Sequence, residues 1–94
     1  MRGHIITEEQ FLHQGIDHRV FVTAIENAEN EYRFEVRRIA PGADHAETVY
    51  EKVVDLSSAF SQCPNTTIDQ LISAELDSVK HEVSAEEDIH AHDP

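Results

Sequence analysis

Apolar residues recur at spacings of three and four between Thr66 and Val83, and this stretch constrains the fold more than any other part of the chain. The recurring residues are Ile68, Leu71, Ile72, Leu76, Val79 and Val83. This spacing places them on one stripe of an α-helix of about 17 residues, roughly 25 Å long. An apolar surface must lie against that stripe, so the rest of the chain is expected to supply one.

Three other stretches predict β-strands. Residues 19–26 are rich in β-branched and aromatic side chains, and residues 31–39 alternate apolar with charged ones. The Asn-rich segment 27–30 predicts a turn that joins the two strands into a hairpin, with the arginines on the side away from the core. Residues 47–56 predict a third strand; because the alternation is less regular there, a helix is the alternative.

The segments around these strands predict shorter helices. Residues 7–10 have the form of a capping box, and Gly15 is a suitable stop, so we expect a two-turn helix near the N-terminus. The alternative is an N-terminal arm in which Ile5 and Ile6 add an edge strand. Residues 57–63 predict one helical turn capped by one of its first two serines. Asn65 or Thr66 is expected to cap the long helix.

Together these elements predict a single α+β domain spanning residues 1–83. Its core is a three-stranded antiparallel meander, with the long C-terminal helix packed on one face and the short N-terminal helix beside it. Residues 84–94 are polar and acidic, and we expect them to form a disordered tail.

Cysteine usage and the N-terminal sequence indicate a compartment. The single cysteine, Cys63, excludes an intramolecular disulfide and favours a reducing environment. The N-terminus lacks the apolar run of a signal peptide, so a cytoplasmic location is expected. Cys63 has acidic neighbours and no histidine tied to it by a known pattern, so a buried or half-buried structural role is expected. Gly-rich phosphate loops and nucleophile elbows are absent from the sequence, and we expect neither enzyme activity nor a cofactor.

Charge is the most unusual property of the composition. Nineteen acidic residues against seven basic ones give a net charge of −12, and most of the excess lies after Ala40. Such a field repels nucleic acid and anionic membranes, and it attracts basic partners. An alternative interpretation is that the acidic surface serves only solubility.

The acidic surface is the predicted site. We expect a small non-enzymatic module that binds a protein partner with a basic surface, without binding nucleic acid or membrane directly. The predicted contact residues are Asp69, Glu75, Asp77, Glu82, Glu47, Glu51 and Asp55. In the narrower form of this hypothesis, the carboxylates mimic phosphates and block the basic groove of a nucleic-acid enzyme. Small acidic phage inhibitors of restriction or CRISPR enzymes act in this way.

The competing hypothesis is a homodimeric domain that binds a metal or small ligand through histidines. His13 and His18 flank Gly15, and the tail places His90 and His92 near acidic residues. Converging ligands on a well-held backbone are needed for a metal site, and no spacing motif connects these residues. We therefore expect surface histidines and no metal site.

A small group of arginines on the predicted hairpin offers a second dimer model. Arg33, Arg37 and Arg38 lie in one strand, and Arg19 is expected across from them. The group could lie at the contact between two copies joined along a sheet edge. Because the alternation places the neighbouring aromatic residues on the core side, we expect these arginines to pair with carboxylates of their own sheet and not to bind nucleic acid.

Overall fold

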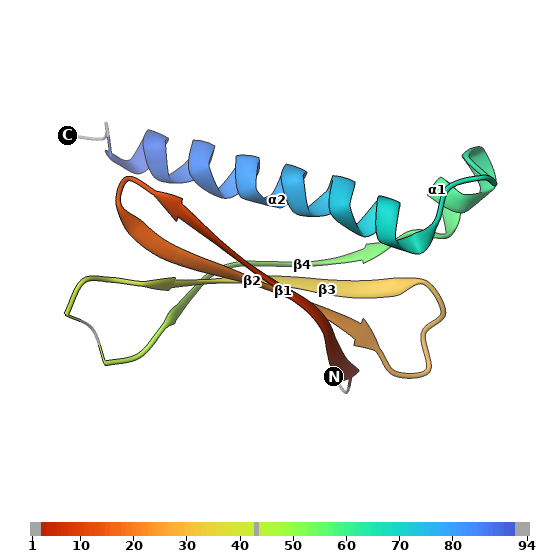
Figure 1. The fold of residues 1–94 in the computed structure, drawn as a ribbon, viewed down its shortest axis with the longest axis horizontal. Coiled ribbons are helices and arrows are strands. Elements are labelled where there is room, and N and C mark those ends of the chain that lie inside the picture. The colour runs from red at the N-terminus through yellow and green to blue at the C-terminus, as the bar shows by residue number, and fades with distance from the viewer. Residues whose placement is uncertain (1–2, 43, 92–94) are drawn as a thin grey trace.

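The computed structural model describes residues 3–42 and 44–91, with the side chains of those residues up to Asp88 (Figure 1). The elements in chain order are β1 (Gly3–His13), β2 (Ile16–Ile25), β3 (Glu31–Ile39), β4 (Glu47–Asp55), α1 (Ser57–Gln62) and α2 (Ile68–Ala91). The predicted α+β class, the antiparallel sheet and the long C-terminal helix are confirmed. The sheet has four strands, however, and not three.

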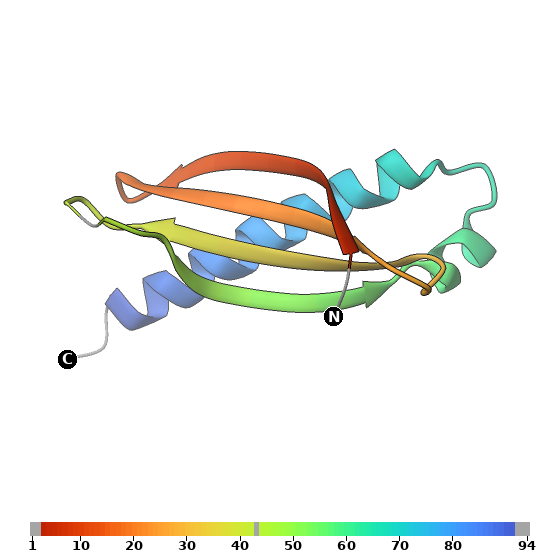
Figure 2. The same ribbon diagram turned by 90° about the horizontal axis from the view of Figure 1, so that it is seen from below.

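The four strands form a meander in the order β1-β2-β3-β4, with every neighbouring pair antiparallel. α2 lies across one face of the sheet, and the short α1 connects β4 to it at one end (Figure 1). Seen from below, with the sheet in front of the helix, α2 crosses the strands diagonally (Figure 2). Within the described residues, no helix covers the second face of the sheet.

The predicted N-terminal helix is wrong, and β1 occupies its place. β1 pairs with β2 from Gly3 opposite Ile25 to His13 opposite Ile16, so the nonlocal ladder prevails over the local capping-box pattern. Gln14 and Gly15 join the two strands with φ angles of 54° and 77°. Positive φ at both central residues is the geometry of a tight type I′ hairpin turn.

The remaining strands agree closely with the prediction. β3 has the predicted bounds, and the turn before it is made with Asn27 and Asn30 at positive φ. The alternative of a helix at residues 47–56 is wrong, because β4 pairs with β3 along its length. The irregular alternation of β4 has a physical cause: a bulge shifts the register between Tyr50 and Thr48, and Val49 packs against the core from within it.

The core lies between α2 and the sheet. Its sheet side is formed by Val20, Val22, Phe34 and Val36, which are completely buried. Its other side is formed by Leu56, Ile72, Leu76, Val79 and Val83. The predicted apolar stripe of the long helix is therefore confirmed, with its first two members only partly buried.

The ends of the helices differ from the sequence prediction. Thr67, and not Asn65 or Thr66, begins α2 with a reciprocal capping box: its hydroxyl accepts from the Gln70 amide at 3.2 Å, and the Gln70 side chain accepts from the Thr67 amide at 3.1 Å. α1 has no serine cap; the Asp55 carboxylate accepts from the Ser57 amide at 2.9 Å.

α2 also continues through residues 84–91, the first part of the segment expected to be a disordered tail. Contacts of Glu87 and Asp88 with the first hairpin stabilise this extension. The last tail residues, 92–94, lie outside the described residues. Among the helices that the structure describes, neither is long and apolar enough to cross a membrane.

Candidate functional site

The seven carboxylates predicted to bind a partner do not form one surface. Two are exposed on α2 and have no ion pair within the described part of the chain: Asp69 and Asp77. Two others point from α2 towards β4: Glu75 and Glu82. The remaining three belong to β4: Glu47, Glu51 and Asp55. The backbone hydrogen bond from Ser57 lowers the pKa of the Asp55 carboxyl group.

The two carboxylates that face β4 are engaged within the protein. The Lys52 amino group lies 2.5 Å from Glu75 and 3.5 Å from Glu82, and the Tyr50 hydroxyl donates to Glu82. Burial acts to lower the pKa of Lys52, but the Glu75 carboxylate outweighs it and raises this pKa. Burial, followed by the hydrogen bond to Glu82, raises the pKa of Tyr50. Glu75 is therefore only partly exposed, because it ties α2 to β4.

The arginines of the open sheet face are also paired, as the sequence suggested. Glu35 is only 7% exposed although no helix covers it, because Arg37 donates to it at 3.2 Å and Thr48 at 2.8 Å. Burial acts to raise the pKa of Glu35, but these hydrogen bonds and the charges of Arg37 and Arg33 lower it overall. The Arg37 guanidinium also lies 4.8 Å from the centre of the Phe21 ring.

The other two arginines pair with neighbouring strands. Arg38 lies 3.1 Å from Glu47 on the α2 side of the sheet, because it is paired with buried His18 and lines a hollow with Val83 and Glu87 of α2. Arg19, on the open face, lies 3.5 Å from Glu8. Each cation of the predicted basic group therefore has a carboxylate beside it, so the open face offers no free row of arginines to a nucleic acid.

A buried histidine is the polar feature that the sequence did not predict. His18 is completely buried, and its ring stacks on Phe11 with the centroids 4.8 Å apart. Its Nδ1 atom lies 2.9 Å from the Ile16 carbonyl oxygen, and its Nε2 atom lies 2.6 Å from Glu87. These contacts hold the β1–β2 hairpin against the last turns of α2.

His13 makes a second contact of the same kind. Its Nε2 atom lies 3.0 Å from Asp88, to which the Gln14 amide also donates. Both histidines thus have carboxylate partners from α2. Across the side chains that the structure describes, no group of three or more potential metal ligands is present. His90 and His92 lie outside those side chains.

Cys63 lies in the turn between α1 and α2 and is exposed, which corrects the expectation of a buried or half-buried thiol. Its amide donates to the Ala59 carbonyl at 2.9 Å, which ends α1. The sulfhydryl lies on the surface, and no basic side chain in the described part of the chain is hydrogen-bonded to it.

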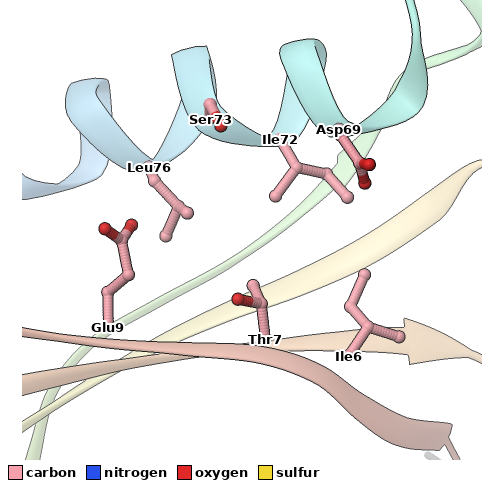
Figure 3. A pocket seen from close by; sticks show the side chains of 7 residues that line it. All are labelled: Ile6, Thr7, Glu9, Asp69, Ile72, Ser73 and Leu76. Carbon is pink, nitrogen blue, oxygen red and sulfur yellow. The ribbon is translucent and has the colours of Figure 1, made fainter.

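A concave surface lies between β1 and the first half of α2, and we call it the β1–α2 groove (Figure 3). It has a volume of about 430 Å³ and is lined by Ile6, Thr7, Glu9, Asp69, Ile72, Ser73 and Leu76. In Figure 3, the side chains of Ile72 and Leu76 point from α2 towards β1, and those of Thr7 and Glu9 point towards α2. The volume falls within the ~300–1,000 Å³ range typical of ligand sites.

The groove combines apolar and acidic groups. Ile6 is 41% exposed, because a bulge leaves it out of the pairing between β1 and β2. Glu9 lies 3.3 Å from the Lys80 amino group, whereas Asp69 has no cation beside it in the described part of the chain. Asp69 was predicted as a contact residue from the sequence, but the groove was not, because a helix was expected where β1 runs.

No protein-family model, curated protein or solved structure matches this chain.

Proposed function

We propose that this protein is a small, acidic, non-enzymatic domain that binds a partner protein with a basic surface. The observation that carries this proposal is the β1–α2 groove, where exposed Ile6 lies beside the apolar side chain of Ile72 and the carboxylate of Asp69. An exposed apolar surface next to an unpaired carboxylate suits a partner that supplies both an apolar contact and a cation.

The charge of the whole chain supports the same kind of partner. A net charge of −12 accelerates association with a basic protein and repels acidic ones. Exposed charges are screened over about 8–10 Å at physiological salt, so the affinity should fall as the ionic strength rises.

The experiment compares capture of partners by three forms of the protein: wild type, Asp69→Lys and Asp77→Lys. The two variants make the same charge change at exposed positions of the same helix, but only Asp69 lines the groove. We expect wild type and Asp77→Lys to retain the same protein from nuclease-treated lysate, released by rising salt, and Asp69→Lys to lose it. Equal retention by both variants, or equal loss, would contradict the groove as the contact.

The narrower form of the proposal is an inhibitor that mimics nucleic acid and blocks a basic groove. Its support is the pair of exposed carboxylates, Asp69 and Asp77, fixed on a rigid helix. In this case duplex DNA or RNA should displace the protein from the captured partner. Binding that persists at saturating nucleic acid would contradict mimicry and leave the groove contact intact.

A further inference from the structure

β1 is an edge strand of the sheet. It pairs with β2 on one side, and no described strand lies on its other side. From Thr7 to His13 the pairing continues without a register shift, so this part of the strand has regular geometry. Its outer edge therefore carries a row of backbone N–H and C=O groups that are available for another strand.

The position of α2 makes this edge different from a fully exposed one. Figure 2 shows the first turns of α2 extending past β1, so part of the helix overhangs the edge of the sheet. A strand added to β1 would lie about 4.8 Å beyond it, and its part beside the beginning of β1 would lie beneath those turns. Every second side chain of the added strand would point to the α2 side of the sheet, and those in this part would face the β1–α2 groove.

We propose that the groove binds an extended segment of the partner protein, which pairs with β1 as an additional strand. One side chain of this segment is apolar and packs against Ile72 and Leu76, and a lysine or arginine two residues away lies beside Asp69. Strand addition of this kind takes affinity from main-chain hydrogen bonds and specificity from alternate side chains. The inference rests on the proposed function, because it specifies how the same groove recognises that partner.

Charge distinguishes such a segment from a second copy of the chain. Two β1 strands paired edge to edge would bring the Glu8 and Glu9 carboxylates of both copies onto neighbouring strands. Like charges across a strand pair are destabilising. A basic segment has the opposite effect, because it meets Glu9 and Asp69 at the groove.

The bulge at Ile6 adds an apolar contact for the same segment. It interrupts the pairing between Ile5 and Thr7 and frees the Ile6 side chain, which lines the groove and remains partly exposed. Bulges near functional sites commonly redirect a side chain in this way.

The test uses nitrogen-15-labelled full-length protein and three blocked nonapeptides. The first, Lys-Ser-Ile-Thr-Lys-Thr-Ile-Ser-Lys, presents lysine and isoleucine alternately on one face of a strand, and its order is the same in both directions. The second replaces each lysine with glutamate. The third replaces both threonines with proline, which keeps the side chains of that face but removes two backbone donors.

We expect the first peptide to shift the amide resonances of β1 and of residues 69–76, and to slow hydrogen exchange along residues 7–11. The proline peptide should bind about tenfold or more weakly, since it loses main-chain hydrogen bonds. The glutamate peptide should not bind. Asp69→Asn should weaken the first peptide severalfold, and Asp77→Asn should leave its affinity unchanged.

Equal binding of the proline peptide and the first peptide, with hydrogen exchange along residues 7–11 unchanged by both, would overturn strand addition while leaving the groove as a contact. Strand addition would also be overturned if the first peptide at millimolar concentration did not shift the amide resonances of the groove residues. The proposed function fails separately, if Asp69→Lys retains the captured partner as well as Asp77→Lys does.

Discussion

The Nε2 atom of His18 lies 2.6 Å from a carboxylate oxygen of Glu87, across 69 positions of sequence. On the other side of the ring, Nδ1 faces the Ile16 carbonyl at 2.9 Å. A carbonyl oxygen only accepts hydrogen bonds, so Nδ1 donates to it, and Nε2 faces the Glu87 carboxyl group. A completely buried ring therefore has a partner at each nitrogen, which joins the first hairpin to the end of α2.

Removing the carboxylate should destabilise the protein. In Glu87→Ala, the buried Nε2 atom loses its partner, and we expect the free energy of unfolding to fall by about 1–3 kcal/mol. Urea denaturation followed by circular dichroism measures this loss. Glu86→Ala is the matched control, since this neighbour is exposed and makes no hydrogen bond to the hairpin among the described side chains, so it should change stability by less than about 0.5 kcal/mol. Equal effects of the two variants would refute the importance of the His18 contact.

Glu35 should make stability depend on pH in the acid range. Its folded pKa is lowered overall, by Arg37, Thr48 and Arg33 against the effect of burial, so its stabilising contribution is present above the unfolded pKa of about 4.3 and is lost as pH falls. Glu35→Gln should be about 1–3 kcal/mol less stable than wild type at pH 7. Below pH ~4.3 its free energy of unfolding should fall less steeply with pH than that of wild type. Denaturant titrations from pH 7 to pH 2 measure both effects.

Glu51→Gln provides the control for Glu35. Glu51 lies directly opposite Glu35 in the β3–β4 ladder, but its side chain is half exposed and 3.9 Å from Arg33. An exposed ion pair of this kind contributes less than about 1 kcal/mol, so the control should keep the wild-type acid profile. If the free energy of unfolding became less dependent on pH to the same extent in both variants, the pH dependence would not come from the buried carboxylate of Glu35.

The capping box of α2 gives a third prediction. Thr67→Ala removes the hydroxyl that accepts from the Gln70 amide, and we expect a loss of about 1 kcal/mol in thermal or urea unfolding. Thr66→Ala is the control, because the adjacent hydroxyl does not cap the helix and should contribute less than about 0.5 kcal/mol. A larger effect at Thr66 would place the start of the helix where the sequence analysis expected it.

The parts of the fold that the sequence predicted correctly are those with an uninterrupted period. The apolar residues of α2 repeat every three or four residues, and β3 alternates strictly from Tyr32 to Arg37. Each pattern therefore identifies its element even when the neighbouring element in the fold is not known. The turn at Asn27 was predicted for a similar local reason, since asparagine tolerates positive φ.

β1 was predicted only as the alternative to a helix, an N-terminal arm in which Ile5 and Ile6 add an edge strand. Its pairing with β2 is nonlocal, and the bulge at Ile6 interrupts the alternation that would have identified a strand. The capping-box form of residues 7–10 then favoured a helix. The groove was missed as a consequence, because it exists only where β1 runs beneath α2.

The partners of the charged residues were equally inaccessible to sequence reasoning. Glu75 sits among polar positions of the helix, yet its neighbour Lys52 comes from another element. Asp69 and Asp77 look equivalent in sequence and are both exposed on α2, but Asp69 lies in the first turn of the helix and faces the groove. Charge count therefore predicted an acidic protein, but only the structure separates structural carboxylates from available ones.

The last prediction tests the core beneath the groove. Leu76 is 5% exposed and packs in the core, but it also lines the groove, so Leu76→Ala enlarges a space that is already open to solvent. We expect a loss of about 2–4 kcal/mol, at the lower part of the range for buried leucines, because water can enter the added space. Leu12→Ala makes the same chemical change at a residue that is 70% exposed and should cost less than about 0.5 kcal/mol. A loss under about 1 kcal/mol for Leu76→Ala would show that α2 is not held by its apolar stripe, and the groove that depends on its position would then be in doubt as well.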